Sequence, residues 1–104
     1  MANRMTELKR LLEHEPNDPF LRYGMAMEHK KAGDLDEAIA WFDKTLEAEH
    51  TYCYAYYHKG QCLESAGKNS EAASVYRKGI EVARGCNDAH AAGEMQAALD
   101  LLDD

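Results

Sequence analysis

The sequence predicts an all-α fold of stacked helical hairpins, and three observations support this prediction. Residues 33–47 recur as residues 67–81, an offset of 34 residues. Within each copy the apolar residues follow helical spacing, as Ala38, Phe42 and Leu46 do in the first copy. Each copy begins with a glycine, which tolerates the positive φ that a chain adopts when it reverses after a helix. A period of this length is typical of units that bury their apolar faces only against their neighbours.

The first element that we expect is a helix over residues 4–14. Its Leu8 and Leu11 precede Phe42 and Thr45 by one period of the repeat. Because Phe42 and Thr45 belong to the second helix of a hairpin, the chain is expected to begin with an unpaired second helix. We refer to this segment as an N-terminal half repeat.

A first full repeat is expected over residues 19–52, as two helices joined at Gly33. Asp34, Asp36 and Glu37 follow this glycine directly. The first backbone N–H groups of a helix have no partner within the helix, and the helix dipole favours anions there. These acidic residues therefore indicate the start of the second helix.

A second full repeat is expected over residues 53–86, with Gly67 at its internal turn. Glu71 and Ala72 in this repeat match a Glu-Ala pair at the same place in the first repeat. The same arrangement of two helices is therefore expected here.

The last element that we expect is a capping helix within residues 87–102. Met95 and Leu99 stand at helical spacing, and Asp88 is placed to cap the N-terminus of the helix. Such a helix would close the open end of the stack. The whole chain of 104 residues is therefore predicted to be one domain.

Both full repeats resemble the tetratricopeptide repeat, whose pattern runs Trp-x2-Leu-Gly-x2-Tyr, then Ala-x3-Phe, then Pro. The corresponding residues of the first repeat are Arg22, Met25, Ala26, His29, Ala38 and Phe42. Those of the second repeat are Tyr56, Lys59, Gly60, Leu63, Ala72 and Tyr76. Arg22, His29 and Lys59 depart from the family's pattern, which bears on the packing more than on the fold. The resemblance implies a right-handed superhelical stack of antiparallel helix pairs with about six helices.

Charge and composition exclude several classes of partner. A net charge of −7 repels nucleic acid and anionic lipid at long range, so neither is an expected partner. The apolar runs are only a few residues long, which is too short for a transmembrane helix. Residues 1–16 carry frequent charges and lack the apolar stretch of a secretory signal. We therefore expect a cytoplasmic protein whose cysteines are reduced.

Residues 50–62 concentrate tyrosine, histidine and cysteine, which raises the question of a metal or redox site. On a helix, His58 and Cys62 share a face, whereas Cys53 and Cys62 point in opposite directions. Zinc needs three or four converging ligands, so a site here would need His50 to lean in from the preceding turn. We expect no metal and no cofactor. We expect no redox role, and we expect the three cysteines to act first as small apolar side chains. If any thiol is reactive, it is expected to be Cys53, which lies near a helix N-terminus.

The sequence also lacks the motifs of common enzyme classes. Neither a phosphate-binding glycine loop nor His-Glu-x-x-His occurs. Paired carboxylates such as Asp34 with Asp36 are more typical of solvated helix ends than of an acid–base pair. We therefore expect a protein that is not an enzyme and has no catalytic residues.

The tyrosines of residues 50–62 are better explained by a binding surface. By the resemblance, the first helix of each repeat lines a concave groove. The residues expected in this groove are Phe20, Tyr23, Met27, Lys30, Lys31, Tyr54, Tyr57, Gln61 and Glu64. Aromatic rings beside a few polar groups are the composition of protein-binding hot spots. The expected function is non-catalytic binding of a short segment of an unidentified partner protein.

Two alternatives use the same surface. The capping helix could cover the tyrosines within the monomer, which would make them part of the core. The surface could also join copies of the chain into homo-oligomers, which would make the domain structural. Each of the three interpretations places Tyr54 and Tyr57 on the same face of their helix.

Overall fold

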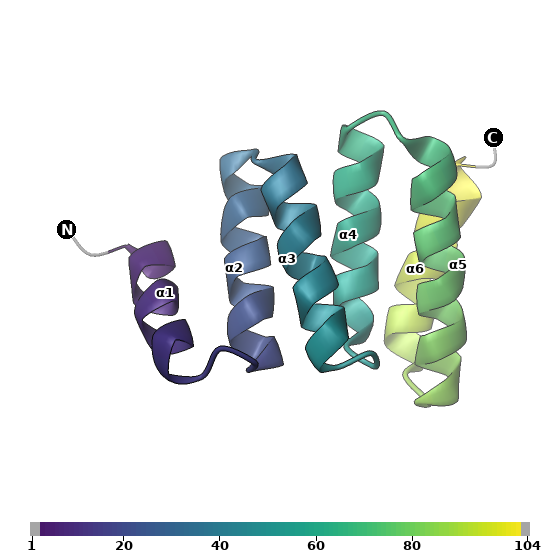
Figure 1. The fold of residues 1–104 in the computed structure, drawn as a ribbon. Coiled ribbons are helices and arrows are strands. Elements are labelled where there is room, and N and C mark those ends of the chain that lie inside the picture. The colour runs from purple at the N-terminus through teal and green to yellow at the C-terminus, as the bar shows by residue number, and fades with distance from the viewer. Residues whose placement is uncertain (1–2, 103–104) are drawn as a thin grey trace.

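The computed structural model describes residues 3–102, which form six α-helices and no strand. The helices are α1 (Arg4–His14), α2 (Pro19–Ala32), α3 (Leu35–Ala48), α4 (Cys53–Ser65), α5 (Asn69–Gly85) and α6 (Ala89–Leu102). Figure 1 shows them arranged in chain order, each antiparallel to the next, with α6 behind α5. The prediction of an all-α stack of about six helices is confirmed.

Side chains cap three of the helix N-termini. Asp18 Oδ1 accepts from the N–H groups of Phe20 and Leu21, with Pro19 at the first turn of α2. Asp88 Oδ1 accepts from Ala91 N at 3.0 Å, so the predicted cap of the last helix is confirmed. At α1, Asn3 accepts from the backbone of the first turn. Each cap satisfies N–H groups that have no partner within the helix.

Gly33 and Gly67, the glycines at the start of the two matching segments, lie where α2 and α4 end, as predicted. Gly33 has φ 84° and Gly67 has φ 78°, both in the left-handed region. Beyond Gly33, Asp34 N donates back to His29 O at 2.9 Å, and Lys68 N makes the equivalent bond beyond Gly67. These backbone bonds satisfy the last carbonyl groups of each helix, and the chain reverses within a few residues.

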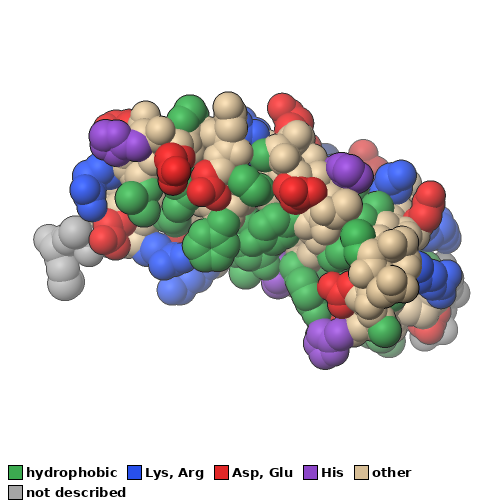
Figure 2. Space-filling view, turned by 90° about the horizontal axis from the view of Figure 1, so that it is seen from below, with side chains coloured by type: hydrophobic (Ala, Val, Ile, Leu, Met, Phe, Trp, Pro, Cys, Tyr) green, Lys and Arg blue, Asp and Glu red, His purple; other side chains and the backbone are tan. Residues whose placement is uncertain are grey.

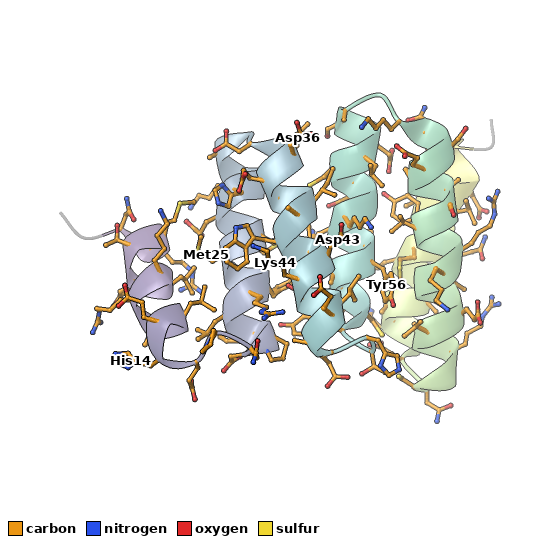
Figure 3. All side chains as sticks on the ribbon, in the orientation of Figure 1. His14, Met25, Asp36, Asp43, Lys44 and Tyr56 are labelled. Carbon is orange, nitrogen blue, oxygen red and sulfur yellow. The ribbon has the colours of Figure 1, made fainter. Side chains whose placement is uncertain are left out.

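The core is divided along the stack into three groups of buried side chains. Leu8, Leu21 and Met25 join α1 to α2. Phe42 lies in the middle group with residues of α2 and α4, and Tyr56 lies in the largest group with residues of α5 and α6. Figure 3 labels Met25 and Tyr56, which belong to the first and last of these groups. Each helix pair therefore buries its apolar side chains against neighbouring pairs.

Arg22 occupies a slot that is aromatic in the repeat pattern, and hydrogen bonds explain how the fold accepts it. Its Nη1 donates to Lys44 O in the last turns of α3 at 2.7 Å. Its Nε and Nη2 donate to Pro16 O and Asn17 Oδ1 in the loop between α1 and α2. The guanidinium thus joins three segments by hydrogen bonds where an aromatic ring would join them by packing.

Lys59 also replaces an apolar residue, and it pairs with a carboxylate on the neighbouring helix. Its Nζ lies 2.6 Å from Asp43 Oδ1, which places an ion pair between α4 and α3. Figure 3 shows Asp43 and Lys44 next to each other on α3. Lys44 Nζ lies 4.2 Å from the ring centroid of Trp41, which is half-buried against the core. Arg22 and Lys59 therefore both have polar partners on α3.

Candidate partner-binding face

The side of the stack formed by α2, α4 and α6 is hollowed. Seen from below, along the helices, the stack bends at the end where α6 lies behind α5 (Figure 2). Hollows lie between α2 and α4 and between α4 and α6. We call this side the concave face. A groove of this kind lets one extended segment touch several helices at once.

Tyr23 is held in place on α2 by two other rings. Its ring stacks on Tyr52 with 4.7 Å between centroids, and it meets Phe42 edge-on at 5.9 Å. Burial raises the pKa of Tyr23 to about 12, so its hydroxyl keeps its proton near neutral pH. The ring is half-buried, which leaves part of it available at the surface.

His58 lies among the aromatic rings of α2 and α4. Its ring centroid is 5.2 Å from Tyr57, 6.0 Å from Tyr23 and 6.4 Å from Tyr54. The aromatic face, as we use the term, consists of Tyr23, Tyr52, Tyr54, Tyr57 and His58. All five residues are half-buried. The sequence prediction did not include His58 or Tyr52, although His58 follows Tyr54 by one helical turn.

Lys30 connects α2 to α4 through two polar contacts. Its Nζ lies 2.9 Å from His58 Nδ1 and also donates to Gln61 Oε1. Because ammonium has no acceptor, His58 Nδ1 must accept this bond and remain unprotonated. Burial and the charge of Lys30 lower the pKa of His58 to about 4, while burial also lowers the pKa of Lys30. The three side chains form a polar cluster beside the aromatic face.

A cavity of about 370 Å³ lies between α4 and α6, further along the concave face. We call it the α4–α6 cavity. Its lining includes Tyr57, Gln61, Glu64, Glu94 and Leu101. Glu64 also accepts a hydrogen bond from the hydroxyl of the fully buried Tyr76, whose pKa burial raises. The capping helix therefore borders this part of the groove and leaves space beside α4.

Comparison with known proteins decides the family. The model of the tetratricopeptide repeat family matches residues 21–49 and 54–86. The chain belongs to the tetratricopeptide repeat family. Proteins of this family are repeat scaffolds that bind protein partners and are generally non-catalytic.

Several solved structures resemble this tetratricopeptide repeat chain. A crystal structure of a tetratricopeptide repeat domain protein from Salinibacter ruber is 35% identical, covers 83% of this chain and 96% of that chain, and has a TM-score of 0.76. A solution structure of a tetratricopeptide repeat domain protein from the same organism is 36% identical, covers 84% of this chain and 88% of that chain, and has a TM-score of 0.78. The solution structure of a Bordetella parapertussis protein shares the fold with a TM-score of 0.88. It is 21% identical, and the match covers 99% of this chain and 90% of that chain. No curated protein matches significantly.

The structure brings most of the predicted groove residues together. Tyr23, Met27, Tyr54 and Tyr57 are half-buried and pack against the core groups beneath them. The polar residues predicted for the groove lie in the same region, as described above for Lys30, Gln61 and Glu64. Two predicted residues differ from the others, because Phe20 is 61% exposed at the start of α2 and Lys31 is exposed at its end.

Two of the three cysteines of this tetratricopeptide repeat domain, Cys53 and Cys62, are core residues, whereas Cys86 is exposed. Cys62 is fully buried. Cys53 is also buried, its thiol donates to Thr51 O at 3.4 Å, and burial raises its pKa. The expectation that Cys53 is a small apolar residue is therefore confirmed. Its choice as the thiol best placed to react is wrong, since a buried thiol with a raised pKa holds its proton. Among residues 3–102, no group of three or more His, Cys, Asp or Glu side chains is placed to hold a metal ion.

Within the described part of the chain, no helix is both long and apolar enough to cross a membrane. The longest helix is α5, Asn69–Gly85, and it carries charged residues on its outer side. The apolar side chains of the stack are used instead in the contacts between helices.

Proposed function

We propose that the chain binds a short segment of a partner protein on its concave face, with the aromatic face as the main contact. The observation that carries this proposal is the cluster of five half-buried rings that make up the aromatic face, one of which is His58. Each ring is fixed by its neighbours and by the core, yet part of each remains exposed. Binding would therefore order few side chains, which is the condition under which aromatic contact area contributes most.

The polar groups beside the rings would orient the bound segment. Lys30 and Gln61 offer a positive charge and an amide near His58, and Glu64 and Glu94 offer carboxylates at the α4–α6 cavity. Rings of tyrosine with a few polar groups at the edge are typical of hot spots in protein interfaces. The net charge of −7 disfavours nucleic acid on the same surface.

Alanine at Tyr54 and Tyr57 tests this proposal. Segments would be selected from a random dodecapeptide phage library on the immobilised protein, and their affinities measured by fluorescence anisotropy. Each substitution is expected to weaken binding by about 1–3 kcal/mol, with the helical circular dichroism unchanged. The matched control is Leu11→Ala, which removes a partly exposed apolar side chain from α1. Affinity that is equal in wild type and in the tyrosine variants would contradict the proposal.

Self-association is the outcome that would change the assignment from partner binding to assembly. Light scattering after size exclusion should give a monomer mass that does not depend on concentration. A stable dimer that Tyr54→Ala and Tyr57→Ala dissociate would instead mean that the aromatic face joins copies of the chain.

A further inference from the structure

The α4–α6 cavity differs in charge from the rest of the concave face. Its two charged lining groups are the carboxylates of Glu64 on α4 and Glu94 on α6, and its described lining holds no Lys or Arg. Lys30, which is bonded to His58 and Gln61, does not line this cavity and instead lines a neighbouring hollow with Gln61 and Glu64. The cavity is therefore a negatively charged place at the end of a mostly aromatic surface.

Both carboxylates keep acceptor capacity for a ligand. Tyr76 donates to Glu64 Oε2, and His90 Nε2 lies 2.8 Å from Glu94 Oε1. A carboxylate has about four acceptor sites on its two oxygens, so one bond leaves most of that capacity free. His90 is exposed, and its contact with Glu94 can exchange with solvent or with a ligand.

The other walls of the cavity are apolar, which suits a long side chain with a charged end. The ring of Tyr57 forms one wall, and Ala98 and Leu101 form another. Leu101 lies outside the core groups and is 75% exposed, so its side chain is open to a ligand. Methylene groups could pack on these walls while a terminal cation meets the carboxylates and the face of Tyr57.

We propose that the α4–α6 cavity binds a lysine or arginine side chain of the partner segment. This inference rests on the proposed function and specifies the chemistry of the segment. Charge complementarity supports it, because an acidic side chain would be repelled by Glu64 and Glu94. A purely apolar side chain would remove water from two carboxylates without replacing their hydrogen bonds. The net charge of the whole chain also favours the approach of a basic segment.

Short defined peptides test the cavity directly. The probes are acetylated and amidated Gly-Gly-Lys-Leu-Gly-Gly and its versions with arginine, norleucine or glutamate in place of lysine, each titrated into ¹⁵N-labelled protein. We expect the lysine and arginine probes to shift the amide signals of Glu64, Glu94 and Leu101. Norleucine keeps the methylene groups and loses the cation, so it should bind about tenfold more weakly. Added salt should weaken the lysine probe more than the norleucine probe.

A pair of charge-matched variants separates the cavity from general electrostatic attraction. Glu64→Gln with Glu94→Gln should weaken the lysine probe about tenfold, because both carboxylate contacts are lost. Glu47→Gln with Glu81→Gln changes the net charge equally on exposed positions of α3 and α5, and it should leave the affinity within about twofold. Equal weakening by both pairs, or equal affinity for lysine and norleucine, would overturn the inference.

This test and the test of the proposed function can fail separately. If library segments bind through Tyr54 and Tyr57 but the lysine probe shifts no cavity signal up to about 10 mM, partner binding stands and the basic-residue inference is overturned. If the lysine probe binds at the cavity and no library segment is selected, the cavity assignment stands and the proposed partner segment fails.

Discussion

His58 is the residue whose environment most constrains its chemistry. Its ring lies among those of Tyr23, Tyr54 and Tyr57, and its Nδ1 accepts from Lys30. Burial is the largest cause of its lowered pKa, and Lys30 is the second. The hydrogen bond with Gln61 and the charge of Glu94 raise the pKa, but by less than burial and Lys30 lower it. His58 is therefore neutral near pH 7, and a protonated ring would both lose this hydrogen bond and face a second positive charge.

Acidification should destabilise the fold through His58. In the unfolded chain the pKa is near 6.5, and in the folded chain it is about 4. Between these values the unfolded state binds more protons, so the free energy of unfolding falls as the pH falls from 6.5 to 4. After a discount for the partly exposed ring, the loss is roughly 1–2 kcal/mol.

The measurement is urea unfolding of wild type and His58→Gln at pH 7 and at pH 4.5. Glutamine keeps an acceptor for Lys30 but does not titrate in this range. Carboxylates titrate in both proteins, so the comparison isolates the histidine. Wild type should lose more stability than the variant on acidification. Equal losses in the two proteins would mean that His58 is no more difficult to protonate in the fold than in the unfolded chain.

At the scale of the helices, the contact between α4 and α5 depends on a glycine, Gly60, because it has no side chain. A Cβ atom built on Gly60 would lie 2.3 Å from Cε1 of Tyr76, whose ring is fully buried. The ring cannot retreat, because it fills the core between the two helices and its hydroxyl is bonded to Glu64. The glycine therefore permits close approach of the two helices, and its backbone freedom is not what the position requires.

Alanine scanning of two helical glycines should give opposite signs. Gly60→Ala is expected to lower the free energy of unfolding by about 1–3 kcal/mol, because it overpacks the contact with Tyr76. Gly93→Ala on α6 is the matched control, since a Cβ there has no neighbour within 4 Å. It should stabilise the protein by about 0.5–1 kcal/mol through the higher helix propensity of alanine. Thermal and urea unfolding of both variants measure this, and a neutral Gly60→Ala would refute the close-approach argument.

The helices were predictable because their signals are local. Helical spacing places Phe42 and Leu46 on one stripe, and Gly33 and Gly67 end helices wherever the chain must reverse. Contacts between helices were less predictable. The hydrogen bond from Arg22 to Lys44 O crosses 22 positions of the chain and depends on how two helices are placed side by side. An amphipathic pattern shows which face is buried and leaves open what a polar residue on that face meets.

In the candidate site, too, positions on one helix were predictable and contacts between helices were not. Tyr23, Tyr54 and Tyr57 were predicted from their equivalent positions in the two repeats, and the structure groups them. The central place of His58 and its bond to Lys30 were missed, because they arise from the lateral distance between α2 and α4. The choice of Cys53 as the thiol best placed to react was wrong, since proximity to a helix start carries no information about what covers the thiol.

At the scale of the whole molecule, stability should differ along the stack. The core groups follow one another from α1 to α6, and the group at α1 is the smallest, with Leu8, Leu21 and Met25. In a linear stack each element is stabilised only by its neighbours, so the two ends need not unfold together with the middle. α1 packs on α2, whereas α5 is covered by both α4 and α6.

Leu8→Ala should therefore release α1 without unfolding the rest of the chain. Leu8 is the buried residue of α1, and its side chain packs against Gly24 of α2. Its truncation is expected to cost about 2 kcal/mol or more, which corresponds to roughly 30-fold faster amide exchange in α1. Amide signals of α5 should keep their wild-type rates in native-state hydrogen exchange followed by NMR. Met95→Ala, which opens the core between α5 and α6, should give the reverse pattern. If Leu8→Ala accelerates exchange in α5 as much as in α1, the six helices unfold as one cooperative unit and the linear account of the stack is wrong.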